Sequence, residues 1–592
     1  MSFKPKLKIK ELVFSGGQKL SIHESDKILI VGPNNSGKSQ TLREIISKLE
    51  LETPEKRVLS DVVFEKTGSF EDLIRYLDEN SHFQNYTYHI GPAQVHKGQV
   101  GSWGSSNAIY SLASMFIKNI TAKDRLNICE QQNSIALGEP KTKPQHILYD
   151  DSMLMEKISN TFRKAFNKDL AFDYRGGSKL PIHLIDRNEF TEFHDRVDNE
   201  YIDKLRSYPL LDKQGDGIKG YAGILFEAIA FNYDICMIDE PEAFLHPPQM
   251  RRLGQTLSEE VKGQLIVATH SSDIMRGFLE GTKGDLKIIR IHREGDKNII
   301  HEVNQEAIKE LWLKPNLKYS NALDSVFHEQ VIICEDDSDC RLVNFVADYL
   351  TEKNNVIFPD TSFVPSGGKH AISGIAKILR LTGVPVKAIY DFDLLSEKNT
   401  FEVALEAFGC NKEKKDSIVN LWKQINAEVT QKIKQKNDTE IKELLLTTIT
   451  ETDAKKISKG MLEEIFKQKK PWSEVKKHGV GGLPYGNIRS VFKELNQELK
   501  NLGIYLVPVG EVENFSPETG LHGPAFVTKF LSEREMDDPE LIPLHSFVQE
   551  VYTGKIHPIG DEPHTEELSG DKVAVEMADN GESLANNGNL CQ

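Results

Sequence analysis

The stretch KILIVGPNNSGKS (Lys27 to Ser39) sets a short apolar run directly before a loop of small and polar residues. The loop itself, GPNNSGKS (Gly32 to Ser39), fits the pattern G-x-x-x-x-G-K-[ST], and a helical pattern follows it. In this order of strand, loop and helix, the backbone N–H groups of the loop and the helix N-terminus face phosphate groups. The stretch therefore predicts an α/β fold built around a nucleotide-binding loop.

The residue types inside the loop match the chemistry of a bound triphosphate. Lys38 should reach the β and γ phosphates, and Ser39 should hold Mg²⁺. The loop residues expected to contact ATP are Gly32, Asn35, Ser36, Gly37, Lys38 and Ser39. A chance match to the pattern is the alternative, but the flanking strand and helix favour nucleotide binding.

A second apolar run ends in carboxylates at ICMIDEPEAFLHP (Ile235 to Pro247). Asp239 is placed to bind Mg²⁺, directly or through water, and Glu240 is placed to orient the attacking water. His270 ends a further apolar run, QLIVATH, where it can sense the γ-phosphate. The alternatives are ordinary solvated carboxylates and a histidine with only a structural role.

The size and charge of the chain limit the classes of protein it can belong to. Its 592 residues exceed what one core supports, so two or more domains are expected. A formal charge of -16 argues against a surface that binds polyanions everywhere, but it allows a local basic groove or a metal-mediated phosphate site. No apolar run has the length of a membrane span, the N-terminus lacks a secretion signal, and the six cysteines are scattered. Residence in the cytoplasm, away from membranes, is therefore expected.

The order of these motifs resembles the ABC-type ATPases of chromosome maintenance and repair. In that family a glycine-containing signature precedes the acidic strand and completes the site of the partner subunit. GDGIKGYAGIL (Gly215 to Leu225) stands at the corresponding place, although it departs from the usual serine-glycine-glycine form. The resemblance implies ATP-sandwich dimers, and it suggests Gln94 as a metal-contacting glutamine.

The second half of the chain repeats the alternation of strands and helices. From about residue 330 the apolar runs are VIICE, NNVIFP, VKAIYDFD and IYLVPV, with a helix expected after the loop PSGGK. Such alternation predicts a second parallel sheet. Carboxylates follow three of these runs, and the carboxyl ends of parallel strands meet at one edge of a sheet. The residues expected to meet there are Glu335, Asp339, Asp391, Asp393, Glu511 and Glu513.

These carboxylates are the hard oxygen ligands that Mg²⁺ or Mn²⁺ prefers. Period two along a strand should place Asp391 and Asp393 on one side of the chain. Two ions roughly 4 Å apart can serve an in-line phosphoryl displacement. The alternative is that each acidic stretch caps a helix, and this explains Asp336 and Asp337 well but explains three separate strand ends poorly.

The second half resembles the Toprim domain of topoisomerases, primases and certain nucleases. Glu335 and the run from Asp391 to Asp393 match the family's glutamate and Asp-x-Asp. Asp336 stands where many nuclease members have glycine, and PSGGKHAI, with Lys369, looks like the family's glycine-rich turn. An ABC-type ATPase followed by a Toprim domain is the architecture of the overcoming-lysogenisation-defect (OLD) nucleases. This resemblance implies catalytic roles for Glu335, Asp391 and Asp393, and for a C-terminal lysine, with Lys529 and Lys555 as candidates.

The chain is expected to divide into two α/β domains and a tail. Residues 1–325 form the ATPase domain, with a helical insertion or dimerisation arm over about 95–205. Residues 326–559 form the Toprim nuclease domain, with a helical, lysine-rich insertion over about 400–480, and residues 560–592 form a disordered acidic tail. In that insertion KQKKPWSEVKKHG (Lys467 to Gly479) is either a DNA grip with a stacking tryptophan or a solvated face whose tryptophan packs inward.

These observations predict an ATP-binding, metal-dependent DNA endonuclease or nickase with slow or conditional ATP hydrolysis. The resemblance implies a homodimer or dimer of dimers that acts on DNA in antiphage defence. Proteins of this kind act alone, with a reverse transcriptase and its retron RNA–DNA product, or with a helicase, and the long lysine-rich insertion and acidic tail suggest the retron-associated class. The alternatives are a DNA clamp of the structural-maintenance type without cleavage and a topoisomerase-like strand-passage protein. A topoisomerase needs a nucleophilic tyrosine, and a primase needs synthesis machinery, and neither is evident.

Overall fold

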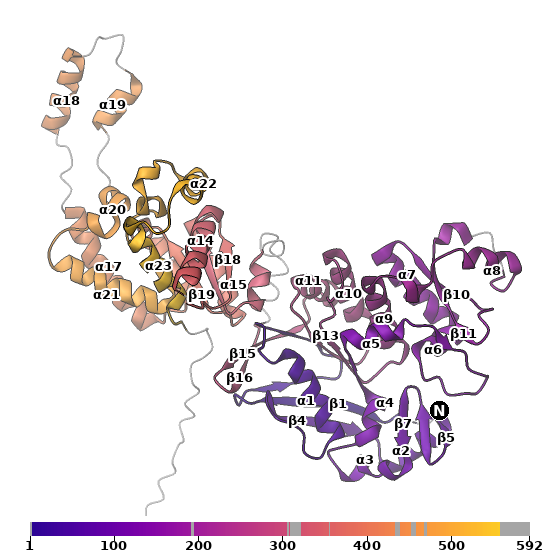
Figure 1. The fold of residues 1–592 in the computed structure, drawn as a ribbon. Helices are drawn as coiled ribbons and strands as arrows, with labels where there is room; N and C mark the ends of the chain where they lie inside the picture. The colour runs from indigo at the N-terminus through magenta and orange to yellow at the C-terminus, as the bar shows by residue number, and fades with distance from the viewer. Residues whose placement is uncertain are drawn as a thin grey trace, which may run out of the picture. The chain divides into compact units, whose positions relative to one another are not determined.

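A computed structural model describes residues 3–190, 195–304, 307, 321–354, 356–431, 438–451, 458–466 and 471–556 (Figure 1). The expected acidic tail, 560–592, lies outside the described residues, as do residues 305–306 and 308–320 before the expected domain boundary at 325. The described parts contain a six-stranded mixed sheet and a four-stranded parallel sheet, each with covering helices, and four smaller antiparallel sheets.

The first half is built on a six-stranded sheet in the order β16-β15-β3-β14-β13-β8. Its strands are β8 (Ile117–Ile120), β13 (Ile235–Asp239), β14 (Gln264–Ala268), β3 (Lys27–Val31), β15 (Lys287–Glu294) and β16 (Lys297–Glu302). All neighbours are parallel except β15 and β16, which form an antiparallel edge. The phosphate loop leaves the middle of this sheet, because β3 lies between β15 and β14.

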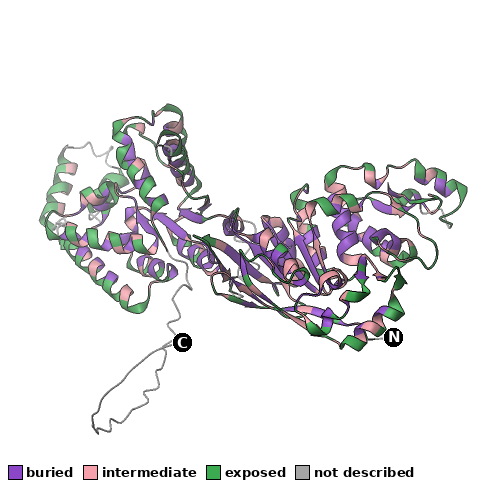
Figure 2. Cartoon of the chain, turned by 60° about the horizontal axis from the view of Figure 1, so that its bottom comes forward, coloured by how far each residue is buried: buried purple, intermediate pink, exposed green. Residues whose placement is uncertain are grey.

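Alternate residues of the strands enter two different cores, which explains why these runs are apolar throughout. Leu29 and Val31 of β3 pack on one face, against α9 (Asp216–Ala230), α10 (Pro247–Glu260) and α11 (Ser272–Thr282). Ile28 and Ile30 pack on the other, against α1 (Lys38–Glu50) and the antiparallel sheet β2-β1-β4. That sheet comprises β1 (Lys6–Phe14), β2 (Lys19–Ser21) and β4 (Leu59–Thr67). Figure 2 shows buried strands beneath helices with exposed outer faces.

The expectation of a helical arm over about 95–205 needs correction, because the segment is mixed. It contains β8, the edge strand of the main sheet, whose polar centre hides it from a search for apolar runs. Its helices are α3 (Ser102–Ser105), α4 (Ala113–Phe116), α5 (Ala122–Ile128), α6 (Pro144–Asp150), α7 (Ser152–Phe166) and α8 (Asn199–Arg206). Its short strands are β9 (Gln132–Asn133), β10 (Asp169–Phe172), β11 (Lys179–Leu180) and β12 (Ile182–Ile185). Before it lie α2 (Phe70–Asn80) and the antiparallel sheet β5 (His82–Gln84), β6 (Thr87–Ile90) and β7 (Ala93–His96).

The second half contains a four-stranded, fully parallel sheet in the order β18-β17-β19-β20. Its strands are β17 (Gln330–Cys334), β18 (Thr361–Pro365), β19 (Val386–Tyr390) and β20 (Ile504–Leu506). One face packs on α14 (Asp337–Asn354), α22 (Gly523–Glu533) and α23 (Ile542–Thr553). The other packs on α15 (Lys369–Leu381), α16 (Lys398–Ala407) and α21 (Asn487–Leu502). The strand order changes direction between β17 and β19, which is where ligands bind in open α/β sheets.

One expected strand is displaced along the chain. The run NNVIFP was expected to be a strand, but the strand is β18 (Thr361–Pro365), which follows it. Ile357, inside the expected run, is 93% exposed. In β18 the buried positions alternate, with Phe363 partly buried and Val364 fully buried, so the pairing with β17 selected the segment that fits a half-covered edge.

The described residues of the segment 400–480 are mostly helical, with turns or irregular residues at 408–411, 458 and 471–472. The segment comprises α17 (Lys412–Gln431), α18 (Asp438–Glu451), α19 (Lys459–Phe466) and α20 (Ser473–His478). Trp472, beside α20, is 8% exposed, and its indole N–H donates to Asn426 Oδ1 at 3.0 Å. The tryptophan therefore packs inward and is not presented for stacking on a base.

Candidate nucleotide and metal sites

The phosphate loop has the backbone conformation that its glycines require. Gly32 and Gly37 have φ values of 138° and 101°, in the region that favours glycine. A Cβ at Gly32 would lie 2.1 Å from the carbonyl oxygen of Ile291, so β15 leaves no space for a side chain there. The main chain of the loop is thus free to approach a phosphate closely.

The two residues expected to hold Mg²⁺ in this site are in contact. Ser39 Oγ donates a hydrogen bond of 2.8 Å to Asp239 Oδ1, although the residues lie 200 positions apart. Burial raises the pKa of Asp239, while the bond from Ser39 opposes this shift. Lys38 Nζ donates to the carbonyl oxygens of Gly32 and Pro33 at 2.8 and 2.6 Å, and burial lowers the pKa of Lys38 to about 8.

A cavity of about 880 Å³ lies over this loop. Glu240 and His270, two of the residues expected to act on ATP, line it, and burial together with the charge of Lys38 lowers the pKa of His270 to about 4. The imidazole is therefore neutral at pH 7 and can accept or donate one hydrogen bond. The cavity also contains basic residues that sequence reasoning missed: Arg43, Lys56, Arg57 and Arg293.

Two further expectations about the nucleotide site have definite places in the fold. The glycine-containing stretch Gly215 to Leu225 forms the first part of α9, with Gly215 as the N-cap and the helix beginning at Asp216. Gln94 lies in β7 of the antiparallel sheet and is exposed, and it is not among the residues that line the cavity. Strand β8 pairs with β13, and the residue that follows the carboxyl end of β8 is Thr121, not Gln94.

The carboxylates of the second half converge at the carboxyl ends of β17, β19 and β20. Glu335 Oε1 accepts a hydrogen bond of 3.3 Å from the backbone N–H of Asp391. The two glycines of the turn before α15 hold the same region, because Gly367 N and Gly368 N donate to the carbonyl oxygen of Glu335 at 3.0 and 2.8 Å. We call the six residues Glu335, Asp339, Asp391, Asp393, Glu511 and Glu513 the acidic cluster.

Mutual repulsion and burial raise the proton affinity of this cluster. Burial raises the pKa of Asp391 to about 9, and the charges of Glu335 and Asp339 add to the shift. Burial raises the pKa of Asp339 to about 7, and the neighbouring Asp336 adds to it. Burial raises the pKa of Glu335 as well, followed by the charge of Asp393. Several negative groups therefore share one desolvated region, where added positive charge is stabilising.

Asp391 and Asp393 do not lie on one side of a strand, as the period of two predicted. Strand β19 ends at Tyr390, and the chain continues into a 3-10 helix, η6 (Phe392–Ser396). Strand β20 likewise ends at Leu506, well before Glu511. The short turns after the strands, rather than the pleat, direct these carboxylates to the cluster. Asp336 caps α14 by accepting from Ser338 N and Asp339 N, as the capping alternative predicted.

Two lysines contact the acidic cluster, and sequence reasoning gave neither of them this place. Lys476 Nζ, from α20, lies 3.0 Å from Asp393 Oδ2 and 3.4 Å from Glu511 Oε1. Lys369 Nζ lies 3.1 Å from Asp393 Oδ2 and 2.8 Å from Glu397 Oε1. The predicted catalytic lysine, Lys529, instead donates to the carbonyl oxygen of Thr519 at 3.1 Å.

A histidine was also missed at one side of the cluster. Among the described residues, the ligand atoms of Glu511, Glu513 and His522 lie within 4.8 Å of one another. Glu513 Oε1 also accepts from Gly523 N at 2.8 Å, which holds the start of α22 against the loop. Imidazole is a ligand that Mn²⁺ accepts more readily than Mg²⁺ does. No local pattern marks His522, because it lies in a loop nine residues after Glu513.

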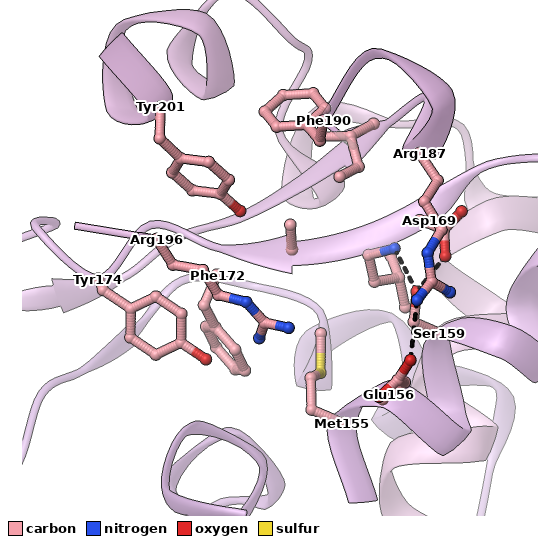
Figure 3. Close-up of a pocket in the computed structure, with 13 residues that line it drawn as sticks. Met155, Glu156, Ser159, Asp169, Phe172, Tyr174, Arg187, Phe190, Arg196 and Tyr201 are labelled. Atoms are coloured by element: carbon pink, nitrogen blue, oxygen red, sulfur yellow. Dashed lines mark hydrogen bonds and ion pairs between the residues drawn. The ribbon is translucent and has the colours of Figure 1, made fainter. Parts of the chain in front are cut away.

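A smaller cavity of about 280 Å³ lies between α7, β10, β12 and α8 (Figure 3). Phe172, Tyr174 and Tyr201 line it, and its buried carboxylate, Asp169, pairs with Arg163 at 2.6 Å and accepts from Ser159 Oγ at 2.9 Å. These polar groups already have partners, and the cavity shares no lining residue with either candidate site.

Comparison with protein families supports the first half of the interpretation. Residues 143–276 match a family model described as "AAA domain, putative AbiEii toxin, Type IV TA system". The matched range contains Asp239, Glu240 and His270. The chain carries a P-loop ATPase domain. No curated protein matches the chain at a significant level.

Solved structures show distant likeness over about half of the chain. The chain is similar to an Smc head bound to the C-winged helix domain of ScpA, with 13% identity, a TM-score of 0.33, and coverage of 50% of this chain and 98% of that one. An SMC head domain from Thermotoga maritima is 14% identical, with a TM-score of 0.25 and coverage of 50% of this chain and 99% of that one. An ATP-binding cassette of an ABC transporter in its ADP conformation is 15% identical, with a TM-score of 0.23 and coverage of 53% of this chain and 98% of that one. Among the described residues of this ATPase-containing chain, no helix is long and apolar enough to cross a membrane.

Proposed function

We propose that the chain is a divalent-metal-dependent DNA endonuclease or nickase whose ATPase domain controls access to DNA. The observation that carries the proposal is the convergence of the acidic cluster at the carboxyl ends of three parallel strands. Resemblance to the OLD nucleases, with their Toprim domain, supports the same conclusion. The toxin named in the matched family description supports a role in defence.

The cluster fits a divalent cation by its own chemistry. Its members are carboxylate oxygens, which suit Mg²⁺ and Mn²⁺. Asp393 Oδ1 is buried and has no hydrogen-bond partner among the described residues. Burial raises the pKa values of Asp391 and Asp339, so a bound cation would stabilise the charged forms of these carboxylates. Glu335, Asp339, Asp391, Asp393, Glu511 and Glu513 would hold the ions.

The residues then divide the work of phosphodiester hydrolysis. A bound divalent cation supplies neutralisation of the phosphate charge and easier ionisation of a water molecule. Glu335, which accepts from the backbone N–H of Asp391, and Asp391 itself would orient that water and accept its proton. Lys369 fixes Asp393 from the side of α15, and Lys476 presents a positive charge at the rim, where a phosphate of DNA can approach.

In this proposal the ATPase domain acts as the switch. Ser39 and Asp239 would hold Mg²⁺ beside ATP, Glu240 would orient the water, and hydrolysis would be slow or conditional on DNA. The protein would act as a homodimer or dimer of dimers, with a reverse transcriptase or a helicase as its partner in defence. ATP binding would change the balance between a DNA-accessible and a closed form, because ligand binding shifts a protein toward the state that binds it better.

The direct test is cleavage of supercoiled plasmid by the purified full chain with MgCl₂ or MnCl₂. Asp391→Ala should abolish nicked and linear products while ATP binding persists. Asp337→Ala is the matched control, because Asp337 belongs to the acidic run of Glu335 and Asp339 but is exposed, and its ion pair within the described residues is with Arg341. Intact supercoils with every variant would indicate a clamp, relaxed closed circles would indicate a topoisomerase, and either result would overturn the nuclease proposal.

A further inference from the structure

Arg125 is buried in the ATPase domain in an unusual way. It lies on α5, directly after the edge strand β8, and its side chain has no exposed surface. Its Nη2 donates to the carbonyl oxygen of Glu240 at 3.0 Å. Its Nε and Nη1 have no hydrogen-bond partner in the described part of the chain. A guanidinium buried with unpaired donors is costly, so its retention calls for a role.

The carbonyl that Arg125 holds belongs to the residue expected to orient the attacking water. Glu240 has a φ of 47°, in the left-handed region that glycine favours. Its carbonyl also accepts from Ala243 N at 3.1 Å, and its N–H donates to the carbonyl of Ala268 at 2.9 Å. The hydrogen bond from Arg125 holds this strained peptide in place, so the direction of the Glu240 carboxylate depends on Arg125.

The same arginine is packed against helix α9, which contains the glycine-rich stretch Gly215 to Leu225. A Cβ at Gly223 would lie 2.0 Å from the backbone oxygen of Arg125, so the two helices touch through their main chains. Gly220 faces the guanidinium itself, because a Cβ there would lie 3.8 Å from Arg125 Nε. Any shift of α9 therefore moves Arg125.

A buried glutamate continues the connection toward the γ-phosphate side of the cavity. Glu242 is the acidic group with the largest electrostatic effect on Arg125, ahead of Glu240 and Asp239. Its carboxylate accepts from Thr269 Oγ1 at 2.9 Å and from the backbone N–H of His270 at 2.6 Å. The order α9, Arg125, the Glu240–Glu242 turn and His270 forms one continuous set of contacts.

We propose that Arg125 is a positioning residue for ATP hydrolysis that couples helix α9 to the orientation of Glu240. The inference rests on Glu240 as the residue that orients water, and it is independent of the nuclease. A displacement of α9, as when another molecule contacts its exposed N-terminal end, moves the guanidinium and with it the Glu240 peptide. ATP binding itself does not require this contact, because Arg125 is not among the residues that line the nucleotide cavity.

The first experiment compares Arg125→Met and Arg125→Lys with the native full chain. Loss of positioning by Arg125→Met should lower kcat for ATP about 10- to 100-fold while KM and the affinity for a fluorescent ATP analogue stay unchanged. Arg125→Lys keeps one donor for the Glu240 carbonyl and should recover part of the rate. A native kcat in Arg125→Met, or a loss confined to ATP affinity, would overturn the proposal.

The second experiment tests the coupling through α9 without touching the arginine side chain. Gly223→Ala forces the helices apart and should lower kcat in the same way, with KM retained. Gly374→Ala is the control, because a Cβ at this helical glycine of α15 meets nothing within 4 Å. Glu240→Gln separates the two assumptions. If Glu240→Gln hydrolyses ATP at the native rate, Glu240 does not orient the water, and the proposal fails with it. If Glu240→Gln is slow but Gly223→Ala hydrolyses ATP at the native rate, only the coupling through α9 is overturned.

Discussion

Lys476 and Asp393 form an ion pair of 3.0 Å between residues that lie 83 positions apart in the chain. The pair joins α20, at the end of the lysine-rich segment, to the turn that follows β19. Lys476 also reaches Glu511, so one ammonium bridges carboxylates that follow two different strands. The lysine-rich segment is therefore part of the candidate metal site, and not only a solvated appendage.

Removing this ammonium should slow DNA cleavage. Lys476→Ala leaves the rim of the acidic cluster without its positive charge, so a phosphate is held less well there, and the cleavage rate should fall at least about tenfold. The measurement is the rate of plasmid nicking at saturating Mg²⁺, with ATP turnover recorded in parallel and expected to be unchanged. Lys477→Ala is the control, because the side chain of Lys477 is exposed and the contact found for it outside its own helix, within the described residues, is from Asn514 Nδ2 to its backbone oxygen. Equal rates for the two variants would remove Lys476 from the site.

The contact between α20 and the loop that carries Glu511 should be as important for DNA cleavage as Lys476 itself. Gly510 has a φ of 106°, and a Cβ there would lie 2.2 Å from the carbonyl oxygen of Lys476. Gly510→Ala should therefore push α20 and the loop apart and reduce cleavage while ATP binding persists. The readouts are plasmid nicking and the affinity for an ATP analogue. Native nicking by a folded Gly510→Ala protein would show that this contact is dispensable.

Stability without divalent cations should fall as the pH rises. The folded-state pKa values of Asp391, about 9, and of Asp339, about 7, lie above the ordinary value for aspartate of about 3.9. The folded protein therefore binds more protons than the unfolded chain between these limits, and this contribution to stability is lost progressively from about pH 4 to pH 9. The thermal midpoint in EDTA should decrease over that range, since these groups must ionise next to one another.

Divalent cations should reverse this loss, because they bind the deprotonated carboxylates. The rise in thermal midpoint on adding Mg²⁺ or Mn²⁺ should be larger at pH 8.5 than at pH 6. Asp391→Asn should reduce this pH dependence, and Asp337→Asn should not. A cation-induced shift that is the same at both pH values in the native chain would argue against metal binding at the acidic cluster.

ATP binding should depend on Lys38 while folding does not. Among the described residues, the Lys38 ammonium donates hydrogen bonds to the loop carbonyls of Gly32 and Pro33, so Lys38→Ala should leave the fold intact and weaken ATP binding by a factor of about 10 or more through the lost phosphate contact. Lys48→Ala on the same helix is the control, because Lys48 forms an ion pair with Asp61 and lines no part of the cavity. Isothermal titration with ATP and Mg²⁺ distinguishes the two. Comparable affinity in both variants would contradict the assigned role.

The strands that carry the chemistry could be predicted because they are fully buried. Runs such as KILIV and ICMID show their nature in a few adjacent residues, and the pattern of the phosphate loop fixes its own conformation. Expectations failed where short or half-covered elements were involved. Strand β8 has a polar centre, and β18 lies just beyond the apolar run that was expected to form it. In such elements the partner strand decides the pairing, and local composition does not.

The nucleotide-binding loop and the strands that end in carboxylates can be recognised from the amino-acid sequence alone. Each is a short run of consecutive residues whose types set its own backbone conformation or burial. The other side chains that meet these runs are known only from the folded chain. Arg125 lies 115 positions before the carbonyl it holds, and Lys476 is one of several similar lysines in its segment. Contacts of this kind arise from helix packing over long separations, and a single lysine or arginine carries no local mark of the partner it will have.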